Sequence, residues 1–233
     1  MNIHYTASPQ GRNEVNSRAR TQGVLLLVGN MLLDFTRLEP RHAYQWMVST
    51  ILPRPIAWVS TISREGRTNL APFSFFQGVT ANPPTLMVVP VNKRDGSKKD
   101  TVRNIEEVPE FVVSICSYAL AEKMNATASL LPHGESEFDA FEIEAAPSVT
   151  IRPPRVAQAP IAFECTLHSI VPIGEGPLAA NVVFGSIRLA HIDDAVLDAE
   201  GHVDAAKLDA IGRMGGESYT RTRDVFSMRR PDR

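Results

Sequence analysis

Polar side chains between positions 54 and 99 are the ones whose types and spacing suggest chemistry. Short apolar runs there alternate with small hydroxyl and amide groups, and a lysine pair ends the segment. Because a buried hydroxyl without a partner costs about 1–3 kcal/mol, such groups among aromatic residues need a ligand or a protein partner. A flat, partly apolar ligand with an anionic tail, such as a flavin, fits this pattern. A hairpin whose polar residues simply face water is the alternative. The candidate ring contacts are Ser60, Thr61, Asn69, Ala71, Pro72, Phe73 and Ser74.

The residues that follow are suited to the anionic tail. The sequence Lys98-Lys99-Asp100-Thr101 opens a predicted helix over 99–108. The first amides of a helix lack partners within the helix, and its dipole favours an anion there. We therefore predict a phosphate site at Lys98, Lys99 and the Thr101 hydroxyl. In the alternative interpretation Asp100 caps the helix and the lysines form a solvated turn.

Two other motifs carry less weight. The sequence 174–179 (GEGPLA) matches a dinucleotide-binding pattern formally, but Pro177 lies inside it and a strand follows, so we predict a turn. Near the C-terminus, Arg213 and Tyr219 flank a glycine pair. These two side chains could bracket a ligand, line a subunit interface or cap local structure.

Composition excludes several classes of function. The chain has 233 residues, 43% of them hydrophobic, which is enough for one large core or two small ones. Seventeen prolines favour a β-rich domain, and a net charge of −2 offers no footprint for nucleic acid. Cys116 and Cys165 lie in apolar runs, as buried free thiols of a cytoplasmic protein would. The six histidines never fall at metal-ligand spacing, and no GxSxG motif supports a hydrolase.

The first thirty residues differ from the rest. Residues 1–30 are mostly polar, and we predict a disordered extension or a leader, with Met31 as an alternative start. The apolar run at 23–33 raises a signal peptide as a rival. However, Gly29-Asn30 interrupts this run, and it is well short of the ~20 residues that span a bilayer. We expect no membrane association, a single domain over 31–222, and a flexible tail over 223–233.

Residue patterns predict a mainly β domain with a few short helices. Helices are expected at 39–49, at 99–108, at 117–128 with Ser117 as the cap, and at 203–211 between Asp204 and Gly212. Strands are expected at 56–62, 68–76, 85–91, 111–116, 161–171 and 181–192.

Five ordered segments resemble one family. They are RPIAWVSTIS, NLAPFSFF followed by NPPTLMV, SKKDTVRNI, PPRVAQAPIAFEC and RMGGESY. Between residues 33 and 219 the chain thereby resembles the flavin reductase-like family of FMN-binding split-barrel proteins. The resemblance implies a Greek-key-like split β-barrel, usually a homodimer, with noncovalent FMN or, less often, FAD. It implies flavin contacts from the counterparts of 54–61, which adds Arg54, from 69–74, and from Lys99-Asp100-Thr101 at the phosphate.

The activity expected from this resemblance is NAD(P)H:flavin oxidoreduction. Hydride would pass from the nicotinamide to the flavin, whose chemistry makes protein acids and bases dispensable. Hence we nominate no indispensable catalytic residue. His191 is a candidate on the nicotinamide side, although a surface histidine at a strand end is the simpler explanation. The protein could serve as the reductase component of a two-component monooxygenase. The alternative is a flavoredoxin-like electron carrier that oxidises NAD(P)H poorly.

Overall fold

The computed structural model describes residues 24–27, 29–132 and 134–231, which form two compact units divided after Met47. In the first unit, β1 (Val24–Leu27) and β2 (Asn30–Leu33) pair as an antiparallel hairpin, followed by the 3-10 turn η1 (Phe35–Arg37). Residues 1–23 and 28 of the predicted leader lie outside the described residues, and the hairpin covers its last part. Helix α1 (Pro40–Thr50) begins in this unit and confirms the helix predicted over 39–49. Pro40 stands at its first position, where a missing N–H costs nothing.

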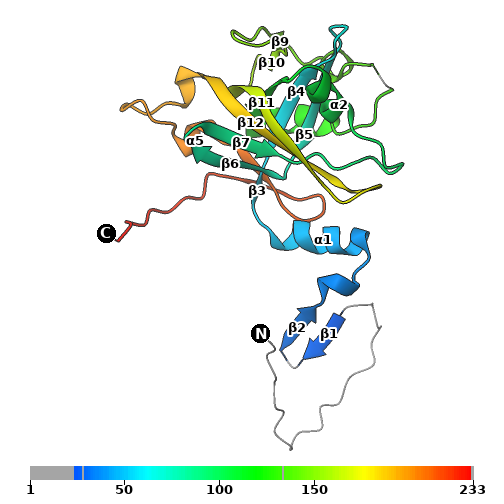
Figure 1. Cartoon of the computed structure of the whole chain (residues 1–233). Coiled ribbons are helices and arrows are strands. Elements are labelled where there is room, and N and C mark those ends of the chain that lie inside the picture. The colour runs from blue at the N-terminus through cyan, green and yellow to red at the C-terminus, as the bar shows by residue number, and fades with distance from the viewer. Residues whose placement is uncertain (1–23, 28, 133, 232–233) are drawn as a thin grey trace, which may run out of the picture. The chain divides into compact units, whose positions relative to one another are not determined.

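The second unit is built on a seven-stranded antiparallel sheet in the order β5-β4-β8-β11-β12-β7-β6 (Figure 1). Its strands are β4 (Ala57–Ile62), β5 (Thr68–Phe73), β6 (Phe76–Ala81), β7 (Pro84–Val88), β8 (Glu110–Ile115), β11 (Ile161–Ile173) and β12 (Ala180–Ile192). Each strand predicted from the sequence has its counterpart here, with ends shifted by a few residues, but the strand predicted over 68–76 ends at Phe73 and β6 is a strand that the residue patterns do not predict. The mainly β class is therefore confirmed.

Shorter elements decorate this sheet. Two further strand groups are β14-β13-β3 and the β9–β10 pair, from β3 (Arg54–Pro55), β9 (Ala145–Ala146), β10 (Arg155–Val156), β13 (Ile211–Arg213) and β14 (Tyr219–Arg221). The remaining helices are α2 (Asp100–Glu107), η2 (Tyr118–Leu120), α3 (Ala121–Ala126), α4 (Glu137–Ala140), η3 (Asp194–Val196) and α5 (Ala205–Leu208). Among the described residues, no helix has the length and apolar character to cross a membrane.

At β4 and β5 the sheet has two covered faces, and alternate residues of these strands enter different cores. On one face Trp58 and Leu70 pack with residues of the segment 116–156. On the other face Val59 and Phe73 pack with Phe111 and with β7 and α2. Because both faces of β4 are covered, its first five residues are all buried. They are either apolar or small and polar.

Two predicted helix boundaries are wrong. Ser117 precedes η2 but makes no side-chain capping bond, and the predicted single helix is divided into η2 and α3. At the C-terminal helix, Asp204 caps α5 as predicted, with its carboxylate accepting from the Ala206 and Lys207 amides. That helix ends at Asp209, in the left-handed conformation at φ 46°, so Gly212 lies in β13 instead of stopping the helix.

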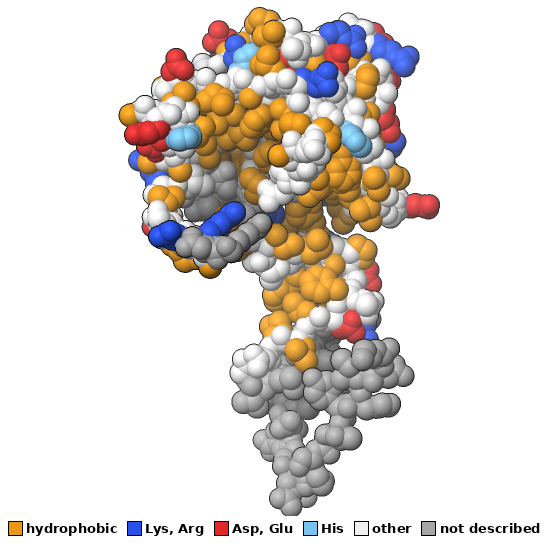
Figure 2. Space-filling view, turned by 60° about the vertical axis from the view of Figure 1, so that its left-hand side comes forward, with side chains coloured by type: hydrophobic (Ala, Val, Ile, Leu, Met, Phe, Trp, Pro, Cys, Tyr) orange, Lys and Arg blue, Asp and Glu red, His pale blue; other side chains and the backbone are white. Residues whose placement is uncertain are grey.

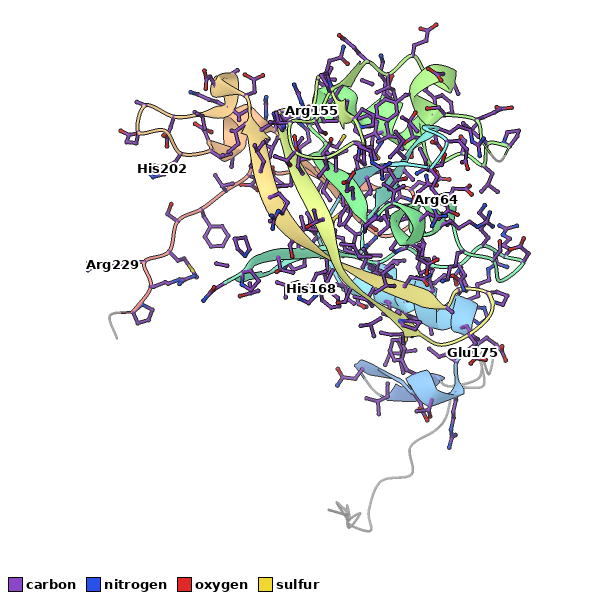
Figure 3. The ribbon with its side chains drawn as sticks, turned by 45° about the horizontal axis from the view of Figure 1, so that its top comes forward. Arg64, Arg155, His168, Glu175, His202 and Arg229 are labelled. Atoms are coloured by element: carbon purple, nitrogen blue, oxygen red, sulfur yellow. The ribbon has the colours of Figure 1, made fainter. Side chains whose placement is uncertain are left out.

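The predicted turn at 174–179 and both thiol predictions are confirmed. The turn joins β11 to β12, with Gly174 and Gly176 at positive φ, and Figure 3 shows Glu175 at its outer tip. Cys116 and Cys165 are buried free thiols. Burial raises the pKa of each to about 12, so neither is a reactive thiolate at neutral pH.

Gly185 of β12 is tightly packed in the barrel core. A Cβ added there would overlap Cζ of the fully buried Phe111 and lie 3.3 Å from the Cys165 Cβ. We expect Gly185→Ala to lower the free energy of unfolding by about 1–3 kcal/mol, because a ring enclosed on all sides cannot move away cheaply. Gly78→Ala in β6 is the matched control, since a Cβ there meets nothing within 4 Å. Urea unfolding followed by fluorescence measures both variants, and equal midpoints would contradict this account.

Candidate functional site

Strand β5 lies at the edge of the sheet, and its outer edge is covered by side chains. The Leu70 amide donates to Glu137 Oε2 at 2.8 Å, and the Thr68 and Ser136 hydroxyls are 2.6 Å apart. Pro72 is two residues beyond Leu70, so its missing N–H falls on the same outer edge, where no strand needs it. Pro72 therefore has a structural reason for its place in the predicted flavin-binding run.

The register of β4 against β5 brings part of the predicted site together. Thr61 is opposite Asn69, and Val59 is opposite Ala71, so Thr61, Asn69, Ala71 and Phe73 share one face of the sheet. Helix α2 lies against this face. Asn69 Nδ2 donates to Thr101 Oγ1 at 3.1 Å and to Thr61 Oγ1 at 3.4 Å. Two of the predicted ring contacts, Thr61 and Asn69, and one predicted phosphate contact, Thr101, are thereby held in one hydrogen-bonded cluster.

Positive charge gathers at the start of α2. Asp100 pairs with Lys93 at 3.3 Å and with Arg103 at 3.5 Å. Lys99 takes part in no ion pair of the described residues; its ammonium lies 5.8 Å from the centre of the Phe73 ring. Burial, and then repulsion from Lys93, lowers the pKa of Lys99. A bound anion would relieve both effects, and Lys99, the N-cap of α2, makes no side-chain capping bond.

The lysine pair of the sequence is divided between two roles. Lys98 forms an ion pair with Glu106 at the other end of α2, and its side chain is 44% exposed. Lys99 alone is directed toward β5. The Asp100 carboxylate pairs with Lys93 and Arg103. The N-cap residue of α2 is Lys99, so the alternative in which Asp100 caps the helix is wrong.

Ser60 and His191 are on the opposite face of the sheet. Ser60 is fully buried, and its hydroxyl donates to the Pro154 carbonyl. His191 Nε2 lies 2.6 Å from Oε1 of the fully buried Glu164. Ser60 and Glu164 are both paired with Val112 of β8, so their side chains lie on the same face of the sheet. Neither Ser60 nor His191 is grouped with Asn69.

The segment 148–156, which we call the strap, is held against the sheet by Ser60 directly and by His191 through Glu164. Glu164 accepts from the Val149 and Thr150 amides, each at 2.7 Å, and from the Thr150 hydroxyl. Arg152 bonds Glu110 at the rim of the same face. In Figure 3, Arg155 of the strap and Arg64 of the β4–β5 turn lie at separate places on the barrel.

Arg54 is a buried structural hub. Only 4% of it is exposed, and its guanidinium donates to the carbonyls of Val48, Ile51 and Met214 and, at 3.3 Å, to the Ser74 hydroxyl. These contacts tie the last turn of α1 and the β13–β14 hairpin to the start of the barrel. In that hairpin the Arg213 guanidinium stacks over Tyr219 at 4.4 Å, which favours the structural interpretation of this pair.

A cleft adjoins the Asn69 cluster between the β4–β5 turn, α2 and the segment before α4. Of the predicted residues, Asn69 and Asp100 line it. Sequence reasoning missed Asn104 and Glu137, which also line it. Asn104 was detectable, because it stands three residues after Thr101 on the same face of the predicted helix. Glu137 was not, since only the fold brings it to β5. Burial is the largest effect on Glu137 and raises its pKa.

Comparison with known proteins matches this architecture. A family model described as a flavin reductase like domain matches residues 48–207. Nitrilotriacetate monooxygenase component B from Bacillus cereus is 32% identical with a TM-score of 0.80, over 84% of this chain and 97% of its own. Pseudomonas fluorescens 2-nitrobenzoate 2-nitroreductase is 32% identical with a TM-score of 0.73, over 83% and 93%. A Shewanella frigidimarina flavin reductase with a split barrel domain shares the fold at 19% identity and a TM-score of 0.73, over 84% and 96%. The barrel is thus the expected split β-barrel.

The strap should make stability depend on pH in the acid range. Burial acts to raise the pKa of Glu164, but the hydrogen bonds from His191, Thr150 and the strap amides outweigh it and lower the pKa to about 2, from 4.5. The stabilisation is complete above the unfolded value and is lost as the pH falls from about 4.5 toward 2. We expect Glu164→Gln to be less stable at pH 7 and to lose less stability on acidification. Thermal melts from pH 7 to pH 3 measure this, with exposed Glu175→Gln as the control. Parallel curves for Glu164→Gln and the wild type would refute the prediction.

Proposed function

Since the chain belongs to the flavin reductase-like family, we propose that it binds FMN noncovalently and oxidises NAD(P)H. FAD is the less favoured flavin. The observation that carries this proposal is the hydrogen bond from Asn69 to Thr101, which joins β5 to the start of α2, where the Lys99 ammonium lies near the Phe73 ring.

The donor set of this cluster fits the parts of FMN. A phosphate dianion suits the uncapped start of α2 and the Lys99 ammonium, which is the cation there without an ion-pair partner among the described residues. A flat ring suits the neighbourhood of Ala71, whose small side chain allows close approach, and of Phe73. Asn69 lies between the two and offers an amide to the sugar-like chain or the ring edge. We assign these roles to the side chains of Asn69, Ala71, Phe73 and Lys99 and to the backbone amides of Asp100 and Thr101 at the start of α2.

The protein's contribution to hydride transfer is positioning. Bound FMN supplies the hydride-accepting chemistry, so the chain has to hold the ring, exclude water from one side and leave the other side open to the nicotinamide. Lys99 and the α2 amides fix the charged end. Asn69 fixes the middle. His191 is held by Glu164 on the other face, so we assign it to stability and propose no catalytic acid or base.

Relatives support a partner for the reduced flavin. Nitrilotriacetate monooxygenase component B is named as one component of a monooxygenase, and at 32% identity it supports a reductase role for this chain in a two-component system.

We also propose a cytoplasmic homodimer. Exposed apolar side chains of the barrel unit, including Val79, Val171 and Ile173, support an interface, and Figure 2 shows hydrophobic side chains gathered on one face of this unit.

Anaerobic absorbance spectroscopy tests the function. Purified protein, or protein titrated with FMN, should be yellow, and its flavin absorbance should bleach on addition of NADH or NADPH. The nucleotide that reduces the bound flavin at the higher rate is the preferred reductant. Failure to bind FMN would refute the proposal. Tight FMN binding with slow reduction by both nucleotides would favour the electron carrier instead.

Lys99 and Lys98 form a matched pair for testing the phosphate site. We expect Lys99→Met to weaken FMN binding about ten- to a hundredfold, because a charge-assisted hydrogen bond contributes about 1.5–3 kcal/mol. Lys98→Met should bind FMN nearly as the wild type does, because Lys98 pairs with Glu106 away from β5. Riboflavin, which has no phosphate, should bind both variants and the wild type equally. Fluorescence titration measures all the dissociation constants, and equal losses for both lysine variants would refute the assignment.

A further inference from the structure

Four polar side chains from three elements form one hydrogen-bonded network beside the cleft. Asn69 of β5 donates to Thr101 of α2 and to Thr61 of β4, at 3.1 and 3.4 Å between Nδ2 and Oγ1. Asn104, one turn farther along α2, donates to Thr61 Oγ1 at 3.0 Å. The network joins β4, β5 and α2 at the point where the proposed phosphate site meets the sheet.

The members of this network differ in burial. Thr61 is 0% exposed and Thr101 is 1% exposed, whereas Asn69 and Asn104 are half-buried and line the cleft. The two amides can therefore meet a ligand, and the two hydroxyls lie behind them. A hydroxyl oxygen accepts two hydrogen bonds, and the Asn69 and Asn104 amides occupy both positions on Thr61.

We propose that Thr61 and Asn104 are positioning residues for the flavin site, an inference that rests on the proposed function. The Thr61 hydroxyl holds two amides at fixed angles, so that Asn69 presents its remaining polar atom to the ligand. Asn104 anchors α2 to β4 and thereby sets the distance from Lys99 to β5. Thr61 itself does not touch the cofactor. The sequence suggested Thr61 as a direct flavin contact, whereas here it positions other residues. The sequence assigned no role to Asn104.

Substitutions at two adjacent buried hydroxyls separate this role from general stability. Thr61→Val keeps the shape and removes the acceptor shared by the Asn69 and Asn104 amides, so that Asn69 keeps only its bond to Thr101 and Asn104 loses its anchor on β4. Ser60→Ala removes the neighbouring hydroxyl on the opposite face, where it holds the strap. We expect Thr61→Val to raise the FMN dissociation constant about tenfold or more, and Ser60→Ala to lower the melting temperature while leaving that constant within about twofold. Thr61→Ser should restore binding, because it restores the acceptor.

A double-mutant cycle tests whether the two positions act through one network. If Asn104 acts through Thr61, Asn104→Ala and Thr61→Val together should weaken FMN binding little more than the worse single variant. Fluorescence titration of the flavin-free full chain gives the constants, and circular dichroism of the bound flavin reports its orientation. Should Thr61→Val fail to fold, Thr61→Ser and Asn104→Ala still decide the matter, because wild-type affinity in Asn104→Ala would overturn the proposal.

The outcomes distinguish this inference from the function on which it rests. A wild-type chain that binds no FMN would refute the proposed function. A wild-type chain that binds FMN, with Thr61→Val equal to it, would refute the positioning role alone. Additive losses in the double variant would also overturn the network, since they would show two independent contacts with the cofactor.

Discussion

The antiparallel register of β4 with β5 and β8 is the constraint on which the site depends. Because side chains alternate across a strand, a slip of one residue would move Thr61 and Asn69 to the face that now carries Ser60. The register is determined by large apolar residues on both faces, chiefly Trp58 and Leu70 on one and Val59 and Phe73 on the other. The core thus decides which polar residues of this sheet can meet a ligand.

Electrostatics at the start of α2 depend on the same packing. Helix α2 buries Val102 and Ile105 against the barrel, and that orientation brings Lys99 toward Phe73 while Lys98 turns toward Glu106. Attraction to Asp100 and Glu137 only partly offsets the desolvation of Lys99 and its repulsion from Lys93, so a bound anion would stabilise the charged lysine further. Such an arrangement is more typical of a binding site than of a stabilising ion pair, and it agrees with a ligand that carries a phosphate.

Much of the fold followed from residue patterns, since long apolar strands and a proline-rich chain leave few alternatives to a β-barrel. The helix over 99–108 and its charged start were predictable for the same reason: the apolar period and the lysines are local in sequence. The family resemblance makes Arg54 a predicted ligand contact, and Ser60 is one because a polar residue in a strand has two explanations, a ligand or a distant part of the chain. Only the fold supplies the Met214 and Pro154 carbonyls that bind them.

In the proposed assignment, the two faces of the sheet divide stability from binding. Glu164, His191 and Ser60 satisfy buried polar groups of the strap, and every partner in that set is a protein atom. On the other face, the network at Thr61 ends in amides that line a cleft, so part of its hydrogen-bonding capacity is directed outward. A buried polar network that is closed on itself needs no ligand, whereas one that opens to a cleft is completed by water or by a bound molecule. This difference, rather than the polarity of any single residue, places the proposed flavin site on the face shared by β5 and α2.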